Sequence, residues 1–113
     1  MKNYIQRGET LMLTAPYAVS SGGGALVGSI FGVAATDVAS GEEGEFQVEG
    51  VFDLVRETGA STAWSAGDLI YWDNTNKRAT KTATSNKLIG VAVRAAADGD
   101  ATGRVRLNGA FIS

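Results

Sequence analysis

The sequence predicts an all-β domain, a small barrel or sandwich of short antiparallel strands with at most one helical turn. Apolar and polar residues alternate over Glu45–Glu49 and Gly103–Leu107, which is the period of a half-buried strand. Two further apolar runs, Leu69–Trp72 and Leu88–Val93, are short and rich in β-branched and aromatic residues, as strands are. The 113 residues also include 15 glycines and one proline, which indicates many tight turns and bulges rather than helices.

The first half is expected to hold a terminal arm and a run of short strands. Residues 1–9 are polar and predict an N-terminal arm, which precedes a single β domain of residues 10–113. The first strand, Thr10–Thr14, is expected to end before Pro16, because proline donates no ladder hydrogen bond. A bulge at Gly50 is expected to bend the last strand of this half. The other strands expected here are Ala25–Val27, Ser29–Ala35, Glu45–Glu49 and Val51–Val55.

The second half is expected to begin with a hairpin. Leu69–Trp72 and Arg78–Thr82 form its arms around the loop Asp73–Lys77, whose Asp and Asn side chains suit turn conformations. The one place that suits a single helical turn is Ala95–Asp100, with the turn ending at Gly99. The remaining strands are expected at Leu88–Arg94, Gly103–Leu107 and Ala110–Ile112.

Segments of the first half recur in the second in the same order. Each copy consists of a strand, a loop ending in glycine, an alternating strand, a glycine and an aromatic residue. The sequence therefore predicts an internal pseudo-twofold duplication, with units of roughly 17–55 and 64–113. The loop Asp73–Lys77 is then an elaboration that the first copy lacks. The matching segments are Gly32–Gly41 with Gly90–Gly99, Val48–Phe52 with Leu107–Phe111 after a shift of one residue, and, more loosely, Ser20–Gly22 with Ser65–Gly67.

The composition argues against several classes of protein. There is no cysteine and no histidine, so thiol catalysis, histidine general bases and the commonest transition-metal ligands are excluded. We expect no enzyme, no cofactor, no bound metal and no small-molecule substrate. The net charge is −2 and the basic residues are dispersed, which argues against nucleic-acid binding. The longest apolar stretch, Ala25–Ala35, is too short to cross a bilayer, so we expect a soluble protein without a membrane partner.

Three stretches invite a chemical interpretation. The glycine-rich residues 21–29 lack the lysine of a phosphate-binding loop and are better read as a turn. The acidic group at 42–45 lacks the spacing of a calcium loop and is read as solvated. Adjacent Tyr71 and Trp72 must point to opposite faces of a strand, so one is expected in the core and the other outside. Trp64 and Trp72 are therefore candidates for an exposed aromatic interface.

A family resemblance runs along nearly the whole chain. The residues that carry it are Met1–Gly8, Tyr17–Val19, the glycine turn Ser20–Gly24, Gly32–Ala34, Val48–Phe52, Gly67 with Asp68, Tyr71–Asp73, Ile89–Ala92 and Val105–Leu107. In these residues the chain resembles the DUF2190 family of phage-encoded proteins, often described as capsid cement or head decoration proteins. The resemblance implies a small all-β structural protein of a tailed bacteriophage or prophage virion.

The resemblance also implies a partner. A decoration subunit is expected to bind the outside of the major capsid protein lattice, as a homotrimer at three-fold positions, after assembly in the host cytoplasm. For the capsid contact we expect four apolar residues in or near the arm: Tyr4, Ile5, Leu11 and Leu13. The alternative function is a carbohydrate-binding or host-surface-binding β module of a virion, in which Trp64 or Trp72 would be the sugar platform.

Overall fold

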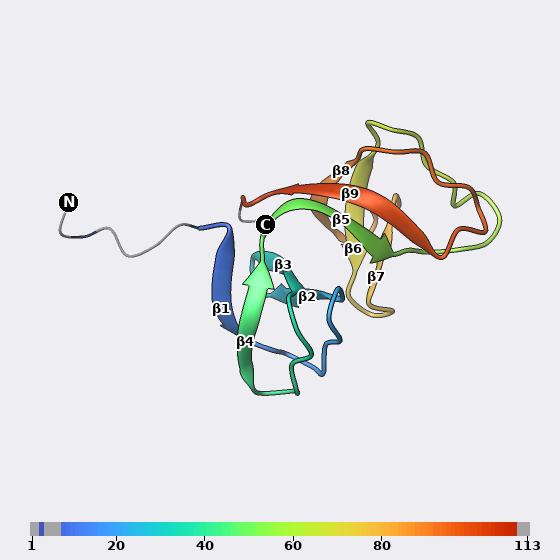
Figure 1. The fold of residues 1–113 in the computed structure, drawn as a ribbon. Coiled ribbons are helices and arrows are strands. Elements are labelled where there is room, and N and C mark those ends of the chain that lie inside the picture. The colour runs from blue at the N-terminus through green and yellow to red at the C-terminus, as the bar shows by residue number, and fades with distance from the viewer. Residues whose placement is uncertain (1–2, 4–7, 111–113) are drawn as a thin grey trace.

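Two antiparallel β-sheets make up the fold in a computed structural model that describes residue 3 and residues 8–110 (Figure 1). The described residues contain nine strands and no helix, and the two sheets pack as in a sandwich. The predicted all-β class is therefore confirmed. The helical turn considered at Ala95–Asp100 is instead a hydrogen-bonded turn in which Asp100 N donates to Ala97 O at 3.1 Å.

The strand bounds agree with the predicted ones to within about two residues. The four-stranded sheet has the order β1-β4-β3-β2, with β1 (Thr10–Thr14), β2 (Gly24–Val27), β3 (Ile30–Ala34) and β4 (Glu43–Gln47). The five-stranded sheet has the order β5-β9-β8-β6-β7, with β5 (Glu49–Val55), β6 (Leu69–Asp73), β7 (Arg78–Thr80), β8 (Lys87–Ala92) and β9 (Thr102–Asn108). The final strand expected at Ala110–Ile112 lies outside the described residues except for Ala110, which belongs to no strand.

One continuous extended segment joins the two sheets. From residue 43 to residue 55 the odd positions are exposed, while the even positions are buried or half-buried. Only Val48 separates β4 from β5, and the chain passes there from one sheet into the other (Figure 1). Gly50 adopts a φ of 131°, which favours glycine. The bulge predicted at Gly50 is wrong, because β5 pairs with β9 through Glu49, Gly50 and Val51 without a shift in register. Because β5 pairs with β9, the strand expected to end the first unit lies in the second sheet.

The two sheets repeat one strand arrangement. The order β4-β3-β2 in the first matches β9-β8-β6 in the second, with β1 and β5 as the flanking strands. The pair Val33↔Gln47 has its counterpart in Val91↔Arg106, with the one-residue shift that the sequence match also contains. Outside the strands, two isolated bridges correspond in the same way, Val19↔Val38 and Trp64↔Ala96.

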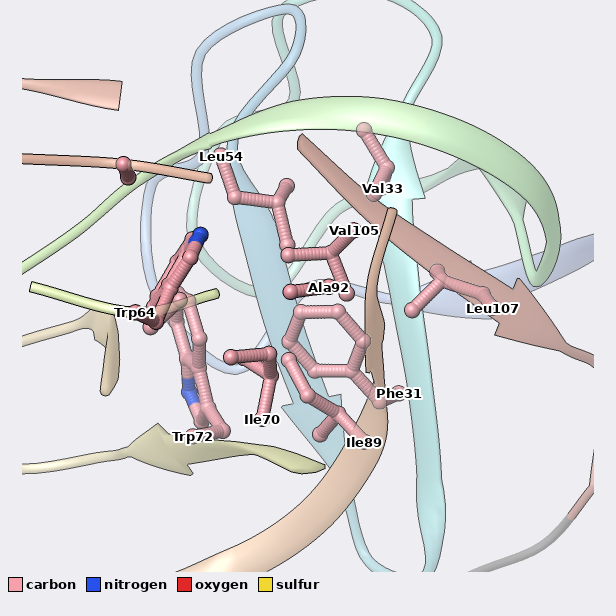
Figure 2. Packing of buried hydrophobic residues seen from close by; sticks show 12 residues of the cluster. Phe31, Val33, Leu54, Trp64, Ile70, Trp72, Ile89, Ala92, Val105 and Leu107 are labelled. Carbon is pink, nitrogen blue, oxygen red and sulfur yellow. The ribbon is translucent and has the colours of Figure 1, made fainter. Parts of the chain in front are cut away.

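The main core lies between the sheets. Phe31 of β3 packs against Trp72 of β6 with ring centroids 4.9 Å apart, among the side chains of Leu54, Ile70 and Val105 (Figure 2). The opposite face of the four-stranded sheet has a smaller core of its own, which the loops on either side of β2 and β3 supply in part. Its members are Ala15, Val19, Ala25, Ala34, Val38 and Phe46. The outer face of the five-stranded sheet, in contrast, is covered by no described strand.

Candidate functional site

The residues expected to contact a capsid fall at and before the edge of the first sheet. Tyr4 and Ile5 lie outside the described residues. Leu11 and Leu13 lie on β1, where both are half-buried, and Leu13 packs against the smaller core. Met12 points to the other face and is 58% exposed. The alternation within β1 thus makes Met12, rather than either leucine, its most exposed apolar side chain.

Two acidic side chains lie next to Met12 on β4. The antiparallel register places Met12 opposite Glu45 and Thr14 opposite Glu43, and these four residues form a surface that we call the acidic face. Both glutamates are exposed, and their side chains form no ion pair with any described residue. The acidic face combines one flexible apolar side chain with two uncompensated negative charges.

A second surface lies on the outer face of the five-stranded sheet. The registers align Val51, Arg106, Val91 and Leu69 in one row across β5, β9, β8 and β6. Leu69 is 53% exposed because its neighbour Ile70 takes the inward position. Beside this row is a depression of about 240 Å³, which we call the outer groove. It is lined by Leu69, Leu88, Ile89, Gly90, Val91, Arg106, Asn108 and Ala110.

Neither tryptophan is on the surface, so the predicted exposed aromatic interface is wrong. Trp64 is 3% and Trp72 2% exposed, and both belong to the main core (Figure 2). Trp64 fits because Gly103 leaves room for its ring, since a Cβ at that position would lie 2.0 Å from the indole. The Trp72 ring is covered by Phe31, and Tyr71 takes the half-buried position on the other side of β6. The expectation that these neighbours point to opposite faces is thus confirmed, with Trp72 inside.

The loop between β6 and β7 connects the two halves of the molecule. Nζ of Lys77 lies 4.3 Å from the ring centroid of Tyr17, which comes from the first half. Asp73 holds the loop, because its side chain accepts hydrogen bonds from the backbone of Thr75 and Asn76 and from the amide of Asn76. The side-chain hydrogen bond from Asn76 is the largest of the causes that lower the pKa of Asp73. This elaboration of the second copy therefore stabilises the packing of one half on the other.

A buried arginine connects two other loops. Arg56 donates from Nη1 to the carbonyl oxygens of Ala97 and Asp100, at 2.7 and 2.8 Å, and from Nη2 to that of Thr62. Its guanidinium carbon lies 4.7 Å from the ring centroid of Trp64. Both terminal nitrogens thus bind backbone carbonyls, whereas Nε is buried without a partner among the described residues, and this is a structural arrangement rather than a catalytic one.

The described residues offer little for chemistry. No three acidic side chains among residues 3 and 8–110 gather where they could hold a metal ion. No helix long and apolar enough to cross a bilayer occurs in that part of the chain. The surfaces that remain are the acidic face and the outer groove, which are suited to contact with another macromolecule.

Comparison with known proteins identifies the family. The model of the family described as phage cement protein matches residues 5–107. This match includes all nine strands except the last residue of β9. The chain belongs to the phage cement protein family. No curated protein and no solved structure matches it. As a phage cement protein it is a structural component associated with phage capsids, and the resemblance to capsid cement proteins is confirmed.

Reasoning from the sequence missed both surfaces of this cement protein. A signal for Met12 was present, because Leu11 and Leu13 share one face of β1 and leave Met12 on the other. The outer groove had a weaker signal, since Leu69 and Ile70 are both apolar and the sequence does not say which is covered.

Proposed function

We propose that this cement protein binds the outer surface of the major capsid protein lattice and stabilises the assembled head. The observation that carries the proposal is the family match over residues 5–107, which spans both sheets. A subunit of this kind acts by adding buried area between neighbouring capsid proteins. Each contact is modest, and the total becomes large because many contacts are made at once on one shell. In this role the protein is a homotrimer without enzymatic activity, assembled in the host cytoplasm and located on the capsid exterior.

The N-terminal region is proposed as the capsid contact. Tyr4 and Ile5 belong to the arm, and Leu11 and Leu13 lie directly after it on β1. β1 is the edge strand of its sheet, with β4 on one side and no described strand on the other. An open strand edge can accept a strand from a partner through main-chain hydrogen bonds. Because the arm directly precedes this edge strand in the sequence, its use as an attachment segment is supported.

The test uses capsids assembled without the cement protein. Purified full-length protein is expected to sediment with expanded capsids in a saturable manner and to raise the temperature at which the shells break. A chain lacking residues 1–9 is expected to bind more weakly, and a Lys81→Glu variant, changed at an exposed residue far from the arm in sequence, serves as the control. Absence of saturable binding by the full-length chain refutes capsid binding. Equal binding by the shortened chain refutes only the role of the arm.

The alternative function, a carbohydrate-binding or host-surface-binding module, has lost the feature that suggested it. Both tryptophans proposed as sugar platforms are in the core. No other observation on the described residues favours glycan recognition over capsid binding. A glycan array probed with the purified protein is expected to show no hits.

A further inference from the structure

The two copies of the repeated strand arrangement differ in what covers them. Val33 on β3 is 3% exposed, because that face of the first sheet packs against the second sheet. Val91 on β8 holds the corresponding position, as the matched pairs Val33↔Gln47 and Val91↔Arg106 show. Yet Val91 is only half-buried, and beside it Leu69 and Leu88 are exposed. The second copy therefore presents to solvent a face that the first copy buries.

One charge on this face has no partner in the described part of the chain. The side chain of Arg106 lies in the middle of the row and lines the outer groove, with no hydrogen-bond or ion-pair partner among the described residues. The neighbouring Arg104 differs, since its Nε pairs with Asp53 at 3.2 Å. The outer groove thus offers an apolar depression with one free cation at its side.

The acidic face has the complementary character. It carries Met12, the most exposed large apolar side chain of the first sheet, directly opposite Glu45, with Glu43 one pair further along β4. Methionine is unbranched and flexible, so it fills irregular apolar depressions well. An apolar side chain beside two anions is complementary in charge and polarity to an apolar depression beside a free cation.

We propose that the outer groove of one molecule receives Met12 of a second molecule of the same protein, with Glu45 of the second molecule facing Arg106 of the first. Each chain carries both surfaces, so every molecule can insert its Met12 into one neighbour and receive Met12 of another neighbour in its own groove. Contacts between unlike surfaces close into rings when the rotation permits and otherwise extend. The inference deepens the proposed self-association of the cement protein by naming the two faces that form it. It concerns the protein free in solution and does not require capsid binding.

A second molecule of this protein is favoured as the occupant, because one chain carries both of the complementary surfaces. A surface made for the capsid protein alone would not need its complement elsewhere on the same molecule. The corresponding strands also differ in charge, because Glu45 of β4 and Arg104 of β9 hold matching positions with opposite charges, and the neutral Gln47 corresponds to Arg106. Such opposite charges attract the acidic face of one molecule to the outer groove of another, and they disfavour contacts between two like-charged faces.

The experiment measures the mass of the free protein without capsids, by sedimentation and by light scattering over a range of concentrations. The wild-type chain is expected to associate, while Leu69→Asp and Met12→Asp each yield monomers. Val55→Asp is the matched control, since Val55 is similarly exposed on the same sheet but does not line the outer groove. Thermal unfolding and circular dichroism of every variant establish that the fold is retained.

A charge exchange gives a second and stricter readout. Arg106→Glu and Glu45→Arg should each raise the dissociation constant about 10-fold to 100-fold, because each sets like charges against one another. The chain carrying both changes should associate again, since the pair is restored with reversed sign. Failure of the double variant to recover overturns the pairing of these residues.

Two further outcomes overturn the inference without touching the proposed function. One is a wild-type chain that stays monomeric at its highest soluble concentration. The other is a Leu69→Asp chain that keeps the wild-type mass but no longer binds capsids, which would assign the outer groove to the capsid protein. Conversely, a wild-type chain that associates but ignores capsids supports the inference and refutes the proposed function.

Discussion

Replacing Arg56 with alanine is expected to destabilise the fold by about 3 to 4 kcal/mol. The side chain is 3% exposed and connects the loop that follows β5 with the loop that precedes β9. Three carbonyl oxygens would lose a charged donor, at about 1 kcal/mol each once water partly replaces it near the surface. Loss of the guanidinium above Trp64 adds about 1 kcal/mol.

A methionine at the same position separates hydrogen bonding from packing. Arg56→Met keeps most of the apolar stem but donates nothing to the three carbonyls, so it is expected to be nearly as destabilising as alanine. Arg104→Ala is the matched control, because the side chain of this arginine is 42% exposed and forms one ion pair with Asp53. Removing an exposed pair of that kind changes stability by about 1 kcal/mol or less.

Urea unfolding followed by tryptophan fluorescence measures the effect. For a domain of this size the free energy of unfolding falls by roughly 1 to 1.5 kcal/mol per molar urea, so the midpoint should drop by about 2 to 4 M. The slope should stay unchanged if only the native state is affected. If Arg56→Ala and Arg56→Met unfold at the midpoint of Arg104→Ala, the three carbonyl contacts contribute nothing net and the reasoning is refuted.

Two other perturbations follow from the structure. Gly103→Ala is expected to destabilise the fold by about 1 to 3 kcal/mol, since the added Cβ would overlap the buried Trp64 ring. Gly99→Ala is the control, because its added Cβ meets no atom within 4 Å and should change the urea midpoint little. Equal midpoints for the two variants would contradict the packing described. Asp73 has a lowered pKa in the fold, mainly through Asn76, so its contribution to stability is present above the ordinary value of 3.8 and is lost as the pH falls through the folded value. The stability difference between wild type and Asp73→Asn, measured by urea unfolding across this range, should therefore shrink on acidification, and a constant difference would disprove the assignment.

Local patterns were enough to predict the strands and the repeat. The alternation over Glu45–Glu49 marks the covered and exposed positions of a strand, because successive side chains point to opposite faces. Glycines at recurring positions, such as Gly32 and Gly90, marked two copies of one arrangement. Both are properties of neighbouring residues, which is why they can be read along the chain.

The residues predicted to contact the capsid show that local patterns do not reveal which face of a strand is covered. Leu11 and Leu13 were chosen because apolar residues near an arm suit a contact surface, yet their half-burial reflects the smaller core beneath β1. Met12 was passed over, although it is the exposed residue of the strand. Period two says which residues share a face of β1, but the face that is covered depends on loops far away in the sequence.

By itself, the sequence determined the all-β class, the strand positions, the family and the absence of histidine and cysteine chemistry. Tertiary structure alone decided that β5 joins β9, that the first copy is covered where the second is open, and that both tryptophans are inside. The physical reason is that burial is a property of pairs of surfaces. Trp64 is buried because Gly103 leaves room for its ring, and Trp72 is buried because Phe31 packs against it from the other sheet. Each contact joins residues far apart in the sequence, so the local periodicity of the chain does not predict it.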